Sequence, residues 1–160
     1  MSTPSSLVQD FMTSHPITIN PSDSVESVLK VLEERHVSGL PVVDEAGKVI
    51  GIVSEKDLLF RESPMQPPLY LTFLGSVIYL ESPDKFHQQV KKSLGMLVRD
   101  VMTPNPITTN PETPISEAAH LMLDKRINRL PVVDEAHRLV GIITRHDLVR
   151  ALKPDLSPGS

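Results

Sequence analysis

The 160-residue chain contains no cysteine and no tryptophan, and aromatic residues make up 4% of it. The absence of cysteine excludes disulfides, thiolate nucleophiles and cysteine-based zinc sites, and it is typical of a reducing compartment. The longest apolar segment, residues 69–80, is shorter than the roughly 20 residues that a membrane-spanning helix needs. The N-terminus also lacks the basic start and apolar stretch of a signal peptide. These absences predict a cytoplasmic location and no membrane partner.

Charge and motif content exclude further classes of protein. The net charge is −4, whereas general nucleic-acid binding depends on clustered lysine and arginine, so no nucleic-acid partner is expected. The six histidines show no spacing typical of metal ligands, which predicts no metal site. No P-loop, G-x-G-x-x-G or G-x-S-x-G motif is present, and no nucleophile stands beside a base. We therefore expect no catalytic residues and no enzyme.

An internal repeat organises the chain. L-V-Q-D-F-M-T at residue 7 matches L-V-R-D-V-M-T at residue 97, and L-P-V-V-D-E-A occurs identically at 40–46 and 130–136. The alignment has no gap, and about 40% of its positions are identical. We predict a first repeat at 7–60, a second repeat at 97–152, an insert at 61–96, and disordered tails at 1–6 and 153–160.

Each repeat has the same order of predicted elements. P-I-T-x-N-P indicates an extended segment, L-P-V-V-D and the later G-I-[VI] run indicate a strand hairpin, and Ser54 or Thr144 opens a last helix. The first helix shows an apolar stripe in both copies: Val25, Val28, Leu29 and Leu32, then Ile115, Ala118, Ala119 and Met122. The predicted fold is α/β (α+β), with two β-α-β-β-α repeats related by a pseudo-two-fold axis and their small sheets packed together.

The insert predicts a helix of its own after an apolar stretch. Ser82 stands at the N-cap position, Pro83 at the first helical position, and Gly95 at the end. Apolar residues of the stretch at 69–80 would leave a large exposed patch, so we expect them to pack on the repeats or across a dimer interface. A docking surface for a partner is the alternative.

Three ordered motifs, each present twice, identify a family resemblance. D-x-M-T-x-x-P-I-T, L-P-V-V-D-E and G-h-h-[S/T]-x-x-D (h, hydrophobic) resemble a tandem pair of cystathionine-β-synthase (CBS) domains, called a Bateman module. The resemblance covers both repeats and leaves the insert unexplained. It implies a regulatory module that binds an adenosine compound such as AMP, ADP, ATP (with Mg²⁺) or S-adenosylmethionine between the repeats. It also implies a homodimer that signals to a partner protein, and no obligatory cofactor.

The resemblance implies two related ligand sites, with Asp147 and Asp57 binding the ribose. A carboxylate can accept hydrogen bonds from both hydroxyls of a vicinal diol, and such charge-assisted bonds are strong. Ser54 or Thr144 would bond a phosphate, nearby cations would neutralise it, and the base would lie against the opposite repeat. The first predicted site contains Asp147, Thr144, Arg145, His146, Arg129, Ile17, Thr18, Val37, Ser38 and Gly39; the second contains Asp57, Ser54, Lys56, Ile107, Thr108, Ile127 and Asn128, with Arg129 beside them.

The same residues have a structural interpretation. S/T-x-x-D resembles a capping box, in which a carboxylate bonds back to the residue that caps a helix. Capping and binding are compatible, because the hydroxyl can cap while the carboxylate faces a ligand. Arg129, Arg145 and His146 favour the Asp147 site for an anionic nucleotide. The alternative function is a structural or interaction module that holds no ligand and acts through dimerisation.

Overall fold

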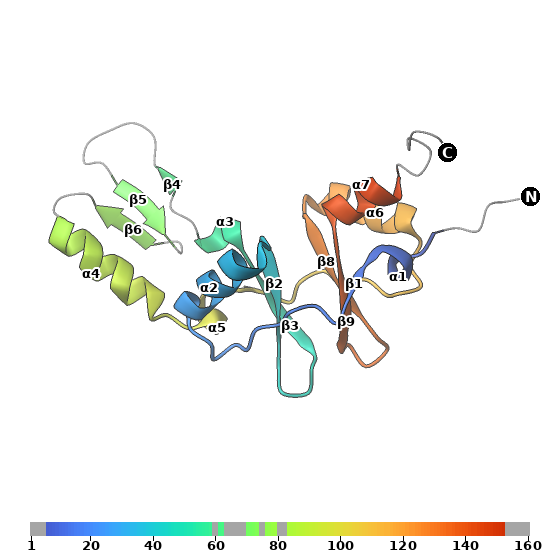
Figure 1. The fold of residues 1–160 in the computed structure, drawn as a ribbon, viewed down its shortest axis with the longest axis horizontal. Coiled ribbons are helices and arrows are strands. Elements are labelled where there is room, and N and C mark those ends of the chain that lie inside the picture. The colour runs from blue at the N-terminus through green and yellow to red at the C-terminus, as the bar shows by residue number, and fades with distance from the viewer. Residues whose placement is uncertain (1–5, 59–60, 63–69, 74–75, 80–82, 153–160) are drawn as a thin grey trace, which may run out of the picture. The chain divides into compact units, whose positions relative to one another are not determined.

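The computed structural model describes residues 6–58, 61–62, 70–73, 76–79 and 83–152 (Figure 1). The first repeat and insert contain α1 (Val8–Phe11), β1 (Thr13–Ser14), α2 (Val25–Arg35), β2 (Gly39–Val43), β3 (Val49–Ser54), α3 (Glu55–Leu58), β4 (Arg61–Glu62), β5 (Tyr70–Phe73), β6 (Ser76–Tyr79) and α4 (Pro83–Leu94). The second repeat contains α5 (Val98–Val101), β7 (Thr103–Pro104), α6 (Ile115–Lys125), β8 (Arg129–Val133), β9 (Leu139–Thr144) and α7 (Arg145–Ala151). The mixed α/β fold class is confirmed.

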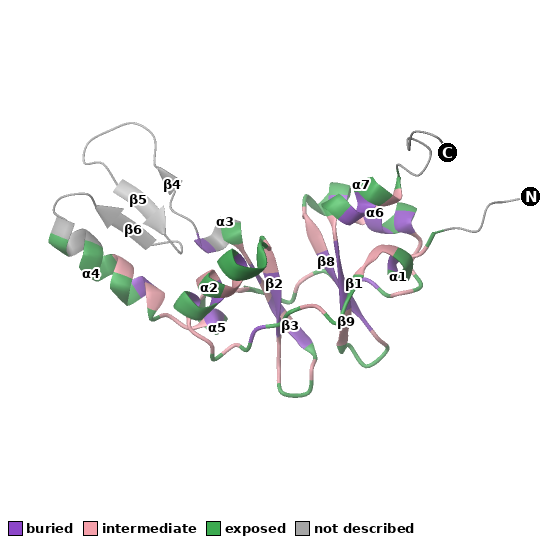
Figure 2. Cartoon of the chain, in the orientation of Figure 1, coloured by how far each residue is buried: buried purple, intermediate pink, exposed green. Residues whose placement is uncertain are grey.

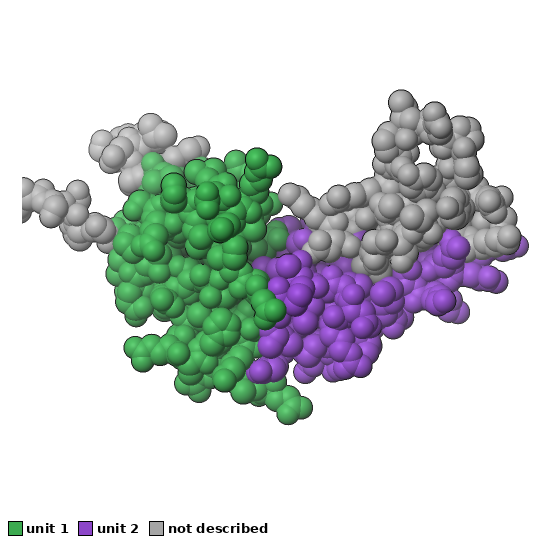
Figure 3. All heavy atoms as spheres, turned by 180° about the vertical axis from the view of Figure 1, so that it is seen from behind, with its two compact units in different colours: residues 1–17, 45–49, 105–160 green, residues 18–44, 50–104 purple. Residues whose placement is uncertain are grey.

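The chain forms two compact units that exchange segments between the sequence repeats (Figure 3). Unit 1 contains residues 1–17, 45–49 and 105–160, and unit 2 contains residues 18–44 and 50–104. Unit 1 therefore combines the body of the second repeat with the first segment of the first repeat. Because the compact units divide the chain differently from the repeats, the boundaries 7–60 and 97–152 stay a prediction about the sequence.

Unit 1 is built on a three-stranded antiparallel sheet with the order β1-β9-β8. The β8–β9 hairpin is the one predicted from the sequence, and it pairs Arg129 with Thr144 at its open end. On the other side of β9, Thr13 pairs with Ile142. The tip of the first hairpin also joins this unit, since the N–H of Leu139 donates to the carbonyl of Gly47 at 3.0 Å.

The core of unit 1 receives its apolar side chains from both repeats. Val8 of α1 is completely buried and packs with α6 and the β8–β9 hairpin, and Phe11 and Met12 pack against the same cluster. The N–H of Val8 donates to the carbonyl of Thr113 at 2.8 Å. Figure 2 shows buried residues along β8 and β9 and on α6. The buried cluster contains Val8, Ile115, Ala118, Met122, Leu130, Val132, Ile143 and Leu148.

Unit 2 repeats this plan with the segments of the two repeats interchanged. Its sheet has the order β2-β3-β7, in which Gly51 pairs with Pro104 of the second repeat. Val98 of α5 is completely buried in the unit 2 core. The predicted extended segment is confirmed here by a parallel bridge between Ile19 and Val42. The buried cluster contains Ile19, Val25, Val28, Leu32, Leu40, Val42, Val53, Leu58 and Val98.

The apolar stripes predicted for the two long helices are confirmed. Val25, Val28 and Leu32 are buried on α2, and Ile115, Ala118 and Met122 are buried on α6. Both helices end on a residue in the left-handed region. His36 has a φ of 53° and Arg126 a φ of 56°, so the two repeats stop their helices in the same way.

The insert forms a small antiparallel sheet, β4-β5-β6, and the helix α4. The helix predicted after Pro83 is confirmed over Pro83–Leu94, with Gly95 immediately after it. The proposed N-cap, Ser82, and parts of the apolar stretch lie outside the described residues. The hairpin β5–β6, which pairs Tyr70 with Tyr79, was missed because the apolar run shows no clear alternation.

The turn of the second hairpin is fixed by Asp134. Its Oδ1 accepts hydrogen bonds from the N–H groups of Ala136 and Arg138, each at 2.9 Å, and Oδ2 lies 3.3 Å from Nε of Arg138. The backbone bond from Arg138 is the main reason why the pKa of the Asp134 carboxyl lies below its usual value. His137 follows with a φ of 64°, at the position that Gly47 occupies in the first repeat with a φ of 81°. The turn thus keeps one backbone form with two different residues.

Candidate functional site

Thr144 and Asp147 form a complete capping box at the start of α7. The backbone N–H and the hydroxyl of Thr144 donate to Oδ2 of Asp147 at 2.9 and 3.0 Å, and the N–H of Asp147 lies 3.3 Å from Oγ1 of Thr144. The capping interpretation is therefore confirmed for this copy. Asp147 is 8% exposed, so a carboxylate is held nearly out of water at a fixed place.

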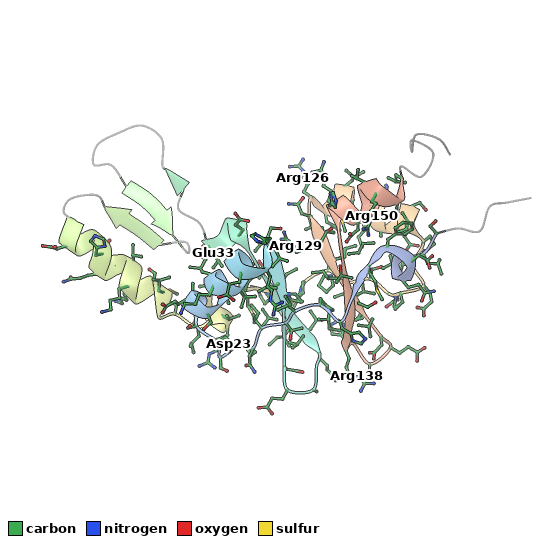
Figure 4. All side chains as sticks on the ribbon, viewed as in Figure 1. Asp23, Glu33, Arg126, Arg129, Arg138 and Arg150 are labelled. Atoms are coloured by element: carbon green, nitrogen blue, oxygen red, sulfur yellow. The ribbon has the colours of Figure 1, made fainter. Side chains whose placement is uncertain are left out.

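The second oxygen of Asp147 faces an arginine that the sequence analysis did not select. Nη2 of Arg150, a residue labelled in Figure 4, lies 3.3 Å from Oδ1 of Asp147, and the same nitrogen donates to the carbonyl of Phe11 at 3.3 Å. The Arg150 side chain is 61% exposed, whereas that of Asp147 is 12% exposed. The i, i+3 spacing on a helix could have indicated the ion pair, but the contact with Phe11 depends on the exchanged segment.

The remaining predicted cations of the Asp147 site lie around the same helix start. Arg129 is half-buried at the first position of β8 and pairs in register with Thr144 (Figure 4). Arg145 and His146 occupy the first two positions of α7, and both are exposed. Within the described part of the chain, the side chains of Arg145 and His146 form no ion pair with an acidic group. This end of α7 therefore carries more positive than negative charge.

In each unit, the loop before the first hairpin strand is bonded to the start of the last helix. The N–H of Arg145 donates to the carbonyl of Asn128 at 2.8 Å, and the N–H of Glu55 donates to that of Ser38 at 2.7 Å. The structure thus brings Ile127 and Asn128 close to α7, and Val37 and Gly39 close to α3. The sequence motifs had instead assigned Val37 and Gly39 to the Asp147 site on α7, and Ile127 and Asn128 to the Asp57 site on α3.

The ten residues predicted around Asp147 are divided between the units. Asp147, Thr144, Arg145, His146, Arg129 and Ile17 belong to unit 1, whereas Thr18, Val37, Ser38 and Gly39 belong to unit 2. The second predicted site is divided in the same way, since Ile107, Thr108, Ile127 and Asn128 belong to unit 1. The assembly of these halves into ligand sites stays a prediction.

Ile17 and Ile107 occupy equivalent places in P-I-T and are equally exposed. Each has 37% of its surface exposed, which is high for a large aliphatic side chain in a compact protein. Thr18 and Thr108 follow them directly, and Thr18 is exposed whereas Thr108 is half-buried. Each repeat thus presents an exposed apolar side chain at this place, and its contact with a ligand base stays a prediction.

The second predicted site is described in part. Ser54 is the last residue of β3 and immediately precedes α3, as predicted. The side chains of Lys56 and Asp57 lie outside the described part of the structure. Their roles stay predictions.

The described residues contain neither a cluster of metal ligands nor a membrane-spanning helix. Among them, no group of three or more histidine and carboxylate side chains is arranged to hold a metal ion. Every helix in this part of the chain is too short or too polar to cross a bilayer.

The chain resembles known proteins in both its sequence and its fold. Residues 8–63 and 98–154 each match the family model of the CBS domain. The chain belongs to the CBS-domain family. It carries two CBS domains, and this agrees with the resemblance stated from the motifs.

Three relatives of this CBS-domain protein are informative. It is 35% identical to MJ1426 of Methanocaldococcus jannaschii over 91% of this chain and 90% of that protein. A crystal structure of CBSX2 in complex with AMP has a TM-score of 0.68 at 34% identity, covering 91% of this chain and 95% of that one. The chain spans 62% of the full length of CBSX2, a chloroplastic protein of Arabidopsis thaliana.

The third relative is a CBS domain pair with different ligands. The structure of the pair from protein MJ0100, in complex with 5-methylthioadenosine and S-adenosyl-L-methionine, has a TM-score of 0.68. It is 27% identical and covers 93% of this chain and 97% of that one. Both ligand-bound relatives therefore hold adenosine compounds.

Proposed function

We propose that this CBS pair is a regulatory module that binds an adenosine nucleotide of the AMP, ADP or ATP class. The observation that carries the proposal is its similarity to CBSX2 in complex with AMP, which extends over 91% of this chain. The buried Asp147 supports it, because a carboxylate fixed by its neighbours is preorganised to accept hydrogen bonds from a ribose diol.

The two predicted sets of residues belong to this proposal. Asp147 and Asp57 would each bind a ribose, and Ile17 or Ile107 would contact the base. Arg145 and His146 are exposed next to Asp147, so they make this site the better one for phosphate groups. Mg²⁺ would accompany ATP through its phosphates.

The proposed role is regulatory and not catalytic. Ligand binding would change the conformation of the pair and signal to a partner protein, which the sequence does not name. A cytoplasmic location is part of the proposal and rests on the lack of cysteine.

A nucleotide panel tests the proposal. AMP, ADP, ATP and S-adenosylmethionine are expected to raise the melting temperature, because a ligand that binds the folded form stabilises it by about 2.7 kcal/mol at 100 times Kd. In calorimetry, Asp147→Asn should weaken AMP binding about 10- to 100-fold, the range expected for lost hydrogen bonds to a charged group. The amide keeps an oxygen for the Thr144 N–H, so the fold should persist.

Asp124→Asn is the matched control, because Asp124 is exposed on α6 and pairs with its neighbour Lys125 at 3.9 Å. It should bind AMP as the natural chain does. If Asp147→Asn binds with unchanged affinity while Asp57→Asn loses binding, the Asp147 assignment is wrong. If no compound shifts the melting temperature at millimolar concentration, the nucleotide proposal is wrong and the ligand-free interaction module is favoured.

A homodimer is the second part of the proposal, and exposed apolar residues of unit 1 support it. Leu123 of α6 is 73% exposed, and Val149 of α7 and the following Leu152 are 42% and 66% exposed. Helices α6 and α7 pack on each other, so these side chains lie on neighbouring elements. Exposed apolar side chains on two helices that pack together favour an interaction surface.

Leu123→Glu tests the dimer. Position 123 corresponds to Glu33 in the first repeat, so the helix at this place is compatible with glutamate. The variant should dissociate at least about tenfold more readily, since burying an unpaired carboxylate in an apolar interface is costly. Sedimentation velocity measures the dissociation. Glu33→Ala is the control, and its particles should have the same mass as those of the natural chain. A natural chain that sediments as a monomer at all concentrations would refute the dimer.

A further inference from the structure

Arg150 connects the proposed ribose carboxylate with the N-terminal helix. One nitrogen, Nη2, lies 3.3 Å from Oδ1 of Asp147 and donates at 3.3 Å to the carbonyl of Phe11, the last residue of α1. Arg150 and Phe11 are 139 positions apart in the sequence. A single guanidinium nitrogen therefore joins α7 to the segment that the first repeat contributes to unit 1.

The Asp147 carboxylate has little remaining capacity to accept hydrogen bonds. A carboxylate offers about four acceptor positions, two on each oxygen. Oδ2 receives the N–H and the hydroxyl of Thr144, and Oδ1 receives Arg150. One position remains, on Oδ1, whereas a vicinal diol donates two hydrogen bonds. One existing donor has to leave when a ribose binds through both hydroxyls.

Arg150 is the donor whose departure costs least. Its distance to Oδ1 is 3.3 Å, beyond the usual range for a strong N–H···O bond, and its side chain is 61% exposed, so water can replace the lost partner. The Thr144 N–H is a backbone group at the start of α7 and has no such alternative. The Thr144 hydroxyl is part of the same capping box.

We propose that a ribose diol displaces Arg150 from Asp147 and that the hydrogen bond from Arg150 to the carbonyl of Phe11 then breaks. Ligand binding and the contact between α7 and α1 thus compete, and Arg150 sets how strongly the site distinguishes a diol from a single hydroxyl. This inference rests on the proposed nucleotide function and names the residue through which occupation of the Asp147 site reaches α1.

The coupling belongs to one of the two repeats. The position equivalent to Arg150 in the first repeat is Phe60, which cannot form an ion pair with a carboxylate. The sequence therefore offers no arginine at the equivalent position for helix α5, the counterpart of α1 in unit 2, and α5 serves as an internal control.

Calorimetry with adenosine and 2′-deoxyadenosine tests the competition. Both are neutral, so attraction between Arg150 and a phosphate does not contribute. Arg150→Gln should bind adenosine about two- to fivefold more tightly, the range that corresponds to a partly exposed ion pair. The affinity for 2′-deoxyadenosine should change little, because the one hydroxyl that remains of its diol, at C3′, uses the acceptor position that is already free. The affinity for adenosine divided by the affinity for 2′-deoxyadenosine should therefore rise in Arg150→Gln. Lys125→Gln is the control, because it removes the same charge from the end of α6, and this ratio should stay unchanged in it.

Hydrogen exchange tests the link to α1. Saturating adenosine should speed amide exchange over residues 8–12 in the natural chain, relative to residues 98–102. Arg150→Gln should show the faster exchange without ligand and no further change with it. Arg150→Lys, which keeps the charge, should retain part of the response.

The outcomes separate this inference from the proposed function. If Arg150→Gln binds adenosine but the ratio of its affinities for adenosine and 2′-deoxyadenosine is that of the natural chain, the inference is wrong and the nucleotide function stands. The same holds if adenosine binds to the natural chain and amide exchange over residues 8–12 does not change. A weaker affinity for both compounds would show that Arg150 merely supports the fold, and it overturns the inference too. No binding of adenosine or AMP by any variant overturns both.

Discussion

Deletion of residues 1–14 is expected to destabilise unit 1 by about 3 to 6 kcal/mol. The deletion removes α1 and β1, and with them the fully buried Val8, which is worth about 1.5–3 kcal/mol by itself. It also removes the strand that covers one edge of β9 and the hydrogen bond between Ile115 and Ser6, which contribute about 1 kcal/mol per bond. Small domains have a total stability of about 5–15 kcal/mol, so unit 1 should be largely unfolded at moderate urea concentrations.

Urea denaturation combined with hydrogen exchange measures this effect. Residues 115–125 of α6 should lose protection, while residues 25–35 of α2 keep most of theirs because Val98 of α5 completes that core. Deletion of residues 1–5 is the matched control, since it leaves every described contact in place. An unchanged urea midpoint for the longer deletion would mean that α1 and β1 are dispensable.

Gly141→Ala is expected to destabilise unit 1 by about 1–3 kcal/mol, the usual cost of overpacking a core. A methyl group at this position would lie 2.5 Å from the sulfur of Met12 and 3.0 Å from the carbonyl oxygen of Thr13. The methionine side chain can move, but the Thr13 carbonyl belongs to β1 and is fixed by its pairing with β9. The substitution therefore pushes the exchanged strand away from the sheet.

Urea midpoints for matched glycine substitutions test this prediction. Gly95→Ala is the control, because the nearest atoms to an added methyl group there lie at ordinary contact distances of 3.5 and 3.9 Å. Gly51→Ala should be destabilising in unit 2, where Met102 and Thr103 take the places of Met12 and Thr13. Gly141→Ala combined with Met12→Ala should remain less stable than Met12→Ala alone, since the Thr13 carbonyl still obstructs. A neutral Gly141→Ala would show that β1 can shift freely.

Local patterns predicted the elements that depend on local interactions. The spacing of Val25, Val28 and Leu32 predicted a helix, and L-P-V-V-D predicted the first strand of a hairpin. These patterns are sufficient to predict the elements, because the periodicity of a helix face or an alternating strand is visible within about ten neighbouring residues. The cap at Thr144 was foreseen for the same reason, since its partner Asp147 is three positions away.

The exchange of segments between the repeats was not predictable from such patterns. L-V-Q-D-F-M-T is short, and nothing in it indicates that Val8 packs with α6 or that Thr13 pairs with Ile142. The motif D-x-M-T was attributed to a family signature, whereas the structure gives its methionine a packing role against Gly141. Contacts over more than 100 positions require knowledge of the topology, which a single sequence does not contain.

The candidate site shows the same division. Thr144, Asp147 and their cationic neighbours were selected because their chemistry is visible in the sequence. Arg150 was not selected, because its significance comes from bridging Asp147 and the carbonyl of Phe11, a backbone atom far away in the chain. The left-handed backbone at His137 was missed because a histidine in the sequence, unlike a glycine, does not indicate a positive φ.

The exchanged segments also set the order in which the protein can fold during synthesis. Unit 2 has all its parts once residue 104 has left the ribosome, whereas α1 is made first and its partner Arg150 comes 139 positions later. At a synthesis rate of about 5–20 residues per second, roughly 7 to 30 s pass between the synthesis of α1 and that of the last helix that contacts it. During that time Val8, Phe11 and Met12 have no native core to enter. The first part of unit 1 to be synthesised is thus among the last parts of that unit to fold.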